Sequence, residues 1–136
     1  MARLCLILLI FVAPVVLQGQ VFNFKNFFID DGLSQSQVTA IDHDSYGNIW
    51  LGTYGGGVNQ FDGHQFKVFG IAQGLPHNQV NDIHVDIRNR VWCAMQSGGV
   101  AMIYRNMMHT YRFDGDESDA VNSITHCKAG IVAGTD

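Results

Sequence analysis

Short apolar runs alternate with turn-forming residues along the chain, and no stretch after residue 20 has the helical period of 3.6 residues. The run from Ile49 to Thr53 is rich in β-branched and aromatic residues, which favour strands. Turn-forming residues flank it at Asp44–Gly47 and at Tyr54–Gly56, where glycine permits a sharp reversal. The alternation predicts four short strands, at Gln37–His43, Asn48–Thr53, Gly57–Phe61 and Gln65–Phe69.

The same pattern returns 42 residues later in one ungapped frame, in which Trp50 falls on Trp92. The second copy predicts strands at Gln79–Val85, Arg90–Met95, Val100–Tyr104 and His109–Phe113. A third copy begins near Val121 and includes Ile131–Thr135. Repeats of about 40 to 45 residues with four short antiparallel strands are typical of β-propeller blades. The predicted fold class is therefore all-β, with two full blades, partial ones and an incomplete ring.

The repeats also give a predicted domain organisation. Residues 1–20 have a basic start at Arg3, an apolar run and a small polar exit, so we expect a secretory signal peptide cleaved after Gly19 or Gln20. The partial propeller spans 21–136. It comprises a blade-completing strand at 22–29, repeat one at 33–73, repeat two at 75–115 and part of repeat three at 119–136. Because about three repeats are needed for stability, we expect this N-terminal fragment to depend on neighbouring blades.

Charge and motif content exclude several classes of function. The formal net charge is −4 and basic residues form no patch, so we expect this segment to bind no nucleic acid. The histidines have no metal-ligand spacing, and the cysteines form no C-x-x-C pair. Asp42–Gly47 begins like a calcium loop but lacks a third acid and the distal glutamate. No Ser/His/Asp order or close carboxylate pair indicates catalysis. We predict a non-catalytic segment with no metal and no cofactor.

Residues that recur at equal positions of the two copies are interpreted as determinants of the blade. Trp50 and Trp92 lie in the middle of predicted strands, where a large ring is expected to pack between adjacent blades rather than to stack on a sugar. The repeat signature consists of Gly32, Leu33, Asp44, Gly47, Trp50, Gly52, Gly56, Gly57, Gly74, Leu75, Asp86, Trp92, Gly98 and Gly99.

Positions that differ between the copies are candidates for ligand binding. Strand direction alternates, so the loop entering each blade and its second hairpin share one face, whereas the turn at 44–48 lies on the opposite face. Loops on a rigid scaffold often carry binding residues. On the shared face, Gln35 of the first copy corresponds to His77 of the second, Ser36 corresponds to Asn78, and Tyr54 corresponds to Gln96. The predicted ligand-binding residues are Gln35, Tyr54, His77, Asn78 and Gln96.

The order of these motifs closely resembles the two-component regulator propeller repeat. It runs Gly-Leu, then Gly47-Asn48-Ile49-Trp50-Leu51-Gly52-Thr53, then Gly56-Gly57-Val58, then Phe66-Lys67-x-Phe69, and the resemblance covers residues 24–136. The second copy departs from the pattern at Asn89-Arg90 and at Cys93-Ala94-Met95. The resemblance implies the periplasmic sensor region of a hybrid two-component histidine kinase, whose parent protein is anchored in the inner membrane.

The resemblance also implies partners beyond this chain. They are an oligosaccharide or another small periplasmic ligand, the remaining blades and domains of the parent sensor, and a second copy of that parent in a homodimer. The ATP-dependent kinase that feeds the phosphorelay has no counterpart in these residues. Two other interpretations stay open: a secreted propeller enzyme, such as a lyase or glycosidase, and a propeller that binds other proteins. The sequence that follows the last blade would distinguish the three.

Overall fold

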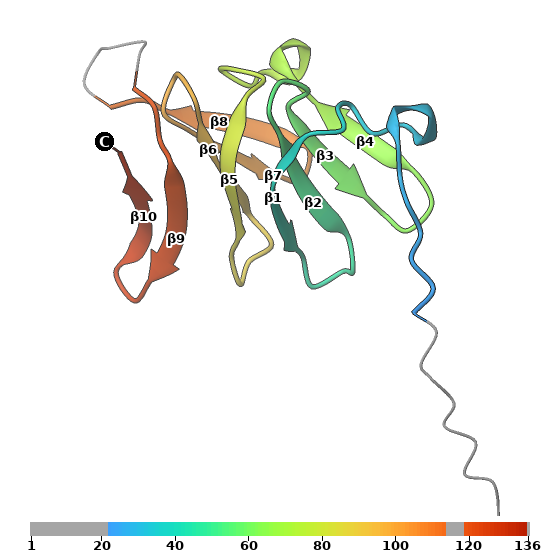
Figure 1. Cartoon of the computed structure of the whole chain (residues 1–136). Helices are drawn as coiled ribbons and strands as arrows, with labels where there is room; N and C mark the ends of the chain where they lie inside the picture. Colours follow the sequence, from blue (N-terminus) through green and yellow to red (C-terminus); the bar gives the residue numbers. More distant parts are fainter. Residues whose placement is uncertain (1–21, 114–118, 136) are drawn as a thin grey trace, which may run out of the picture.

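The structure, a computed structural model, describes residues 22–113 and 119–135, and its strands form three antiparallel sheets side by side (Figure 1). Blade 1 contains β1 (Val38–His43), β2 (Ile49–Thr53), β3 (Val58–Phe61) and β4 (Phe66–Phe69), in that order. Blade 2 contains β5 (Val80–Val85), β6 (Val91–Met95), β7 (Val100–Tyr104) and β8 (Met107–Tyr111). Blade 3 is described by β9 (Ser123–Cys127) and β10 (Gly130–Gly134). The prediction of an all-β, open set of propeller blades is confirmed.

One predicted strand is wrong in its bounds, because β8 begins two residues before the predicted segment His109–Phe113. The connection between β7 and β8 needs only Arg105 and Asn106, which adopt positive φ angles of 50° and 64°. Two-residue hairpin turns require this left-handed region, and asparagine tolerates it well. Strand pairing therefore resumes immediately after the turn, at Met107.

The predicted strand at 22–29 does not form in this structure. Most of it has no regular secondary structure, and its end belongs to a short 3-10 turn, η1 (Ile29–Asp31). A strand needs the backbone groups of a neighbour, and no strand within residues 22–113 and 119–135 pairs with this segment. The ring of Phe27 contacts those of Phe61 and Phe66, with centroids 4.7 and 5.6 Å away. Its role in completing another blade stays a prediction.

Both full blades are entered through the same tight turn. Gly32 and Gly74 end the 3-10 turns η1 and η2 (Ile71–Gln73) with φ angles of 103° and 106°, a region that favours glycine. The next residues, Leu33 and Leu75, are only 6% and 3% exposed. The Gly-Leu motif thus turns the chain and then anchors it. The predicted signal peptide, 1–20, lies outside the described residues, and within those residues no helix is long and apolar enough to cross a bilayer.

The hydrophobic core lies between the blades. Trp50 is 6% exposed and packs with Val80 and Ile83 of blade 2, whereas Trp92, 9% exposed, packs with Val121 and Ile124 of blade 3. Every residue of β6 is buried, because blade 2 is covered on both faces. The first residue of β2 is exposed and its third is half-buried, because the described residues leave the outer face of blade 1 largely open.

Matched polar side chains also link neighbouring blades. Thr39 and Asn81 stand at the β-bulges in β1 and β5. A bulge re-aims a side chain. Here Thr39 Oγ1 donates to the carbonyl of Val80 (2.6 Å), and Asn81 Nδ2 donates to that of Val121 (2.9 Å). These bonds therefore fix β1 to β5, and β5 to the segment that leads into β9.

A repeated glycine brings each hairpin against the next entry loop. Gly57 and Gly99 have φ angles of 79° and 83°. A side chain at either position would collide with the carbonyl oxygen of Phe69 or Tyr111. Because glycine leaves this space free, the Gly57 amide donates to Asn78 O (2.8 Å), and the Gly99 amide makes the matching bond to the next blade.

Candidate functional site

A buried carboxylate organises the first turn of each full blade. Asp44 Oδ1 accepts hydrogen bonds from the backbone amides of Tyr46 and Asn48, both at 3.0 Å. Its Oδ2 accepts from Asn48 Nδ2 (2.8 Å) and from Trp50 Nε1 (3.0 Å). Burial by itself raises the pKa of Asp44, but these hydrogen bonds outweigh burial and hold the pKa below its ordinary value. The carboxylate therefore fixes the turn and the indole ring together.

The second blade repeats this arrangement with one change. Asp86 Oδ2 accepts from Trp92 Nε1 at 3.0 Å, as in blade 1. Its other partner is Arg90 Nε at 2.6 Å, where blade 1 has an asparagine amide. Burial again acts to raise the pKa of Asp86, and the hydrogen bonds again lower it overall. The i, i+6 spacing of Asp and Trp was visible in both copies, but the sequence alone did not indicate their direct bond.

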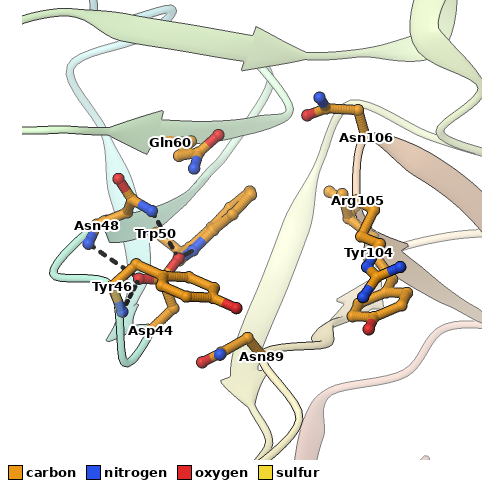
Figure 2. A pocket seen from close by; sticks show the side chains of 10 residues that line it. Asp44, Tyr46, Asn48, Trp50, Gln60, Asn89, Tyr104, Arg105 and Asn106 are labelled. Carbon is orange, nitrogen blue, oxygen red and sulfur yellow. Dashed lines mark hydrogen bonds between the residues drawn. The ribbon is translucent and has the colours of Figure 1, made fainter.

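A polar cleft of about 150 Å³ opens between blades 1 and 2 beside the Asp44 turn. Figure 2 shows its two walls, with Tyr46, Asn48 and Gln60 from blade 1 on one side and Tyr104, Arg105 and Asn106 from blade 2 on the other. Trp50 and Asp44 lie behind the first wall, and Asn89 lies at one end (Figure 2). The two-residue turn between β7 and β8 is what places Arg105 and Asn106 at the rim.

Several polar groups of this cleft have no hydrogen-bond partner within the described structure. They are the hydroxyls of Tyr46 and Tyr104, the Gln60 amide and the Arg105 guanidinium. The Arg105 guanidinium lies 5.1 Å from the centre of the Tyr104 ring, a cation–π contact that holds it over the rim. Tyr46 is 79% exposed. The cleft thus offers donors, acceptors and aromatic surface that the fold does not use.

Three of the five predicted ligand-binding residues make hydrogen bonds within the fold. His77 Nδ1 accepts from the Gln79 amide (3.0 Å), and Asn78 Oδ1 accepts from the Ile71 amide (3.0 Å). Gln96 Oε1 accepts from Asn81 Nδ2 at 3.1 Å and from Gln79 Nε2 at 3.2 Å. The bonds of His77 and Asn78 hold the segment that leads into β5 together, and Gln96 ties the β6–β7 hairpin to that segment and to Asn81 of β5.

The other two, Gln35 and Tyr54, belong to loops that the structure brings together. The Tyr54 amide donates to Gln37 O (3.1 Å), and Gln35 packs against Gly55. Tyr54 is 50% exposed, and the Gln35 Oε1 atom is buried without a hydrogen-bond partner in the described residues. No hydrogen bond within the described residues joins any two of the five predicted side chains. Their role in binding stays a prediction.

A row of titratable side chains crosses the first strands of all three blades. Asp42, His84 and His126 occupy matched positions, 42 residues apart. Asp42 Oδ2 lies 3.7 Å from His84 Nδ1, and His84 Nε2 lies 3.1 Å from His126 Nδ1, with the two rings stacked. Asp42 and His84 line an open groove of about 650 Å³. In residues 22–113 and 119–135 no three such side chains are arranged to hold a metal ion.

Part of the sequence is similar to a known repeat family and to a bacterial histidine kinase. Residues 32–55 match the family described as two component regulator propeller. Over 47 residues, 35% of this chain, the sequence is 51% identical to histidine kinase P4 of Formosa agariphila. The chain spans only 3% of the length of that protein.

The fold is similar to that of two solved extracellular domains from B. thetaiotaomicron, each assigned to a hybrid two component system. One has a TM-score of 0.68 and 22% sequence identity, and the other a TM-score of 0.71 and 21% identity. Each match covers 82% of this chain and 16% of the solved chain. At this level of identity the likeness concerns the fold alone.

Proposed function

We propose that the chain is a non-catalytic, ligand-sensing propeller segment of a two-component sensor histidine kinase, from the premise that residues 32–55 match the two component regulator propeller family. The observation that carries the proposal is the repeat itself, together with the 51% identity to a histidine kinase over 47 residues. The proposed location is the periplasm, with the parent protein anchored in the inner membrane. The proposed ligand is an oligosaccharide.

The mechanism that we propose is a population shift rather than a chemical reaction. A ligand changes the balance between two arrangements of the sensor only if it binds one of them more tightly. Clefts between blades suit this role, because each wall belongs to a different blade and a ligand that touches both walls favours one relative position. In the proposed homodimer, such a shift in both copies would be passed across the membrane to the kinase and the phosphorelay.

The test uses the full-length protein that contains this chain, reconstituted in membranes. We expect its autophosphorylation from ATP to change when a panel of neutral and acidic tetrasaccharides is added, one at a time, to the side that carries the propeller. Deletion of residues 33–113 should abolish the response without abolishing basal phosphorylation. A protein that lacks kinase activity, or whose phosphorylation never responds to any member of the panel, would contradict the proposal.

A further inference from the structure

The cleft between blades 1 and 2 differs from its counterpart between blades 2 and 3 at the positions that line it. At a spacing of 42 residues, Tyr46 corresponds to Arg88, Asn48 to Arg90, and Gln60 to Met102. In the second blade the arginine that replaces Asn48 bonds to Asp86 at 2.6 Å and covers the Trp92 ring at 5.2 Å. The residue that replaces Gln60 is apolar and 8% exposed. Blade 2 therefore uses Arg90 and Met102 for its own packing, whereas in blade 1 the side chains of Tyr46 and Gln60 are polar and have no hydrogen-bond partner within the described residues.

The contents of the first cleft indicate the kind of ligand that fits it. Its volume of about 150 Å³ lies below the range of roughly 300 to 1,000 Å³ that is usual for cofactor and drug sites, so the occupant is small. Aromatic rings with polar tips, such as Tyr46 and Tyr104, present apolar surface and a hydroxyl together. The Gln60 amide offers a donor and an acceptor side by side. A ring that has hydroxyl groups on its edge and C–H groups on its face matches this combination.

The charges around the cleft add a preference for an acidic group. Asp44, the carboxylate among the residues lining the cleft, is buried and already accepts four hydrogen bonds. The Arg105 guanidinium makes no ion pair within the described residues. Lys67 Nζ lies close by and donates to Asn106 Oδ1 at 2.8 Å. Guanidinium groups bind carboxylates strongly, by charge-assisted hydrogen bonds.

We propose that this cleft is a subsite that binds one acidic hexose ring of an oligosaccharide. The ring lies between Tyr46 and Tyr104, its hydroxyls bond to Gln60, and its carboxylate faces Arg105. The inference rests on the proposed function for the source of such a ring, but the binding site itself stands on the geometry of the cleft. Because Tyr46 and Tyr104 belong to different blades, occupancy favours one spacing of blades 1 and 2.

The test is a binding measurement on the full-length protein in lipid nanodiscs, by saturation-transfer-difference NMR. The probes are methyl glucuronide and methyl glucoside, which differ only at C6, where the first has a carboxylate and the second a hydroxymethyl group. We expect the uronide to bind at least tenfold more tightly than the glucoside. Arg105→Gln should remove this difference, and Gln60→Met should weaken binding of both sugars about tenfold, the loss that one missing hydrogen bond of about 1.4 kcal/mol produces. Gln60→Met is compatible with the fold, because methionine occupies the corresponding position of blade 2.

Arg88→Gln is the matched control. Like Arg105, Arg88 is an exposed arginine in a hairpin turn, but its turn, between β5 and β6, faces the boundary between blades 2 and 3. Its variant should bind both sugars like the wild type. The proposal is overturned if the uronide does not bind, if the two sugars bind equally, or if the cleft variants bind like the wild type.

The phosphorylation assay separates this inference from the proposed function. If the sensor responds to an oligosaccharide and the cleft variants respond equally well, the subsite is wrong and the proposed function stands. If the uronide binds in the cleft but no oligosaccharide changes phosphorylation, the subsite stands and the sensor function is wrong.

Discussion

Replacement of Asp44 by asparagine should loosen blade 1 and leave blade 2 intact. Asparagine keeps an acceptor at the Oδ1 position, where the amides of Tyr46 and Asn48 donate. At the Oδ2 position it would place an NH₂ group opposite two other donors, Asn48 Nδ2 and Trp50 Nε1. Two hydrogen bonds to a charged acceptor are lost, each of about 1.5 kcal/mol or more. We therefore expect the local opening free energy of this turn to fall by about 3 kcal/mol.

Hydrogen exchange measures this local change in the full-length protein, where other blades would mask it in a global melt. A loss of about 3 kcal/mol corresponds to exchange more than a hundredfold faster in peptides that cover β1 and β2. Peptides of β5 and β6 in the same molecule should be unchanged. Asp62→Asn is the matched control, because Asp62 is exposed and its Oδ1, which asparagine retains, accepts both bonds from His64 and Gln65. Unchanged exchange in β1 and β2, or an equal effect of the control, would refute the reasoning.

Acid should act on the same two turns. The folded-state pKa values of Asp44 and Asp86 lie below the ordinary value of 3.8. The stability that each carboxylate contributes is therefore fully present above that value, and it is lost as the pH falls through the lower folded-state pKa. Exchange of both blades, corrected for its intrinsic pH dependence, should accelerate below about pH 4 in the wild type. In Asp44→Asn the acceleration should remain in blade 2 and be reduced in blade 1.

Two further predictions concern contacts between the blades, and a third concerns the two cysteines. Gly52→Ala places a Cβ 2.8 Å from Val80 Cγ1, so exchange in β2 and β5 should reveal a loss of about 1 to 3 kcal/mol. Thr39→Val removes the 2.6 Å bond to Val80 O at nearly constant volume. By the same assay the local opening free energy should fall by about 1 kcal/mol, and slower exchange in β1 or β5 would contradict this prediction. Iodoacetamide should label exposed Cys127 quickly in the native protein and Cys93 only after unfolding, because complete burial raises the pKa of the Cys93 thiol.

The strands of the blades follow from the sequence because each depends mainly on local pattern and on recurrence. All six residues that begin or end β5, β6 and β7 lie within one position of the predicted bounds. Strand β8 lies where the 42-residue register places it, since Gln65–Phe69 falls on Met107–Tyr111. The predicted bounds departed from that register, because Arg105-Asn106 does not look like a turn unless a two-residue hairpin with positive φ is considered. The segment at 22–29 has strand-like composition, but composition does not supply the neighbouring strand that its backbone groups require.

The site was harder to predict, because whether a polar side chain is free depends on its partners in space. His77, Asn78 and Gln96 differ from their counterparts and lie in loops, yet each side chain accepts a hydrogen bond from another residue of the fold. Tyr46 and Gln60 also differ between the copies, but they belong to a turn and a strand that recurrence marked as structural. The row of Asp42, His84 and His126 was visible as an exact 42-residue spacing, although no ligand motif indicated it.

The two ends of the blades therefore serve different purposes, for a reason that lies in how the blades are joined. On the face with the β2–β3 and β6–β7 hairpins, each hairpin must bond to the entry loop of the next blade, as Gly57 does to Asn78. Side chains on that face therefore help to hold each hairpin against the entry loop of the next blade. On the opposite face the indole rings pack against the next blade, and Ser45 and Asn89 exchange two hydrogen bonds between the turns (2.9 and 2.8 Å). The side chains of Tyr46, Gln60 and Arg105 take no part in these contacts, so they are free to diverge. Polar groups that diverge without gaining protein partners must be satisfied by water or by a ligand. Tyr46, Gln60 and Arg105 meet that condition together, and this is why the cleft, rather than the joined face, is the stronger candidate for recognition.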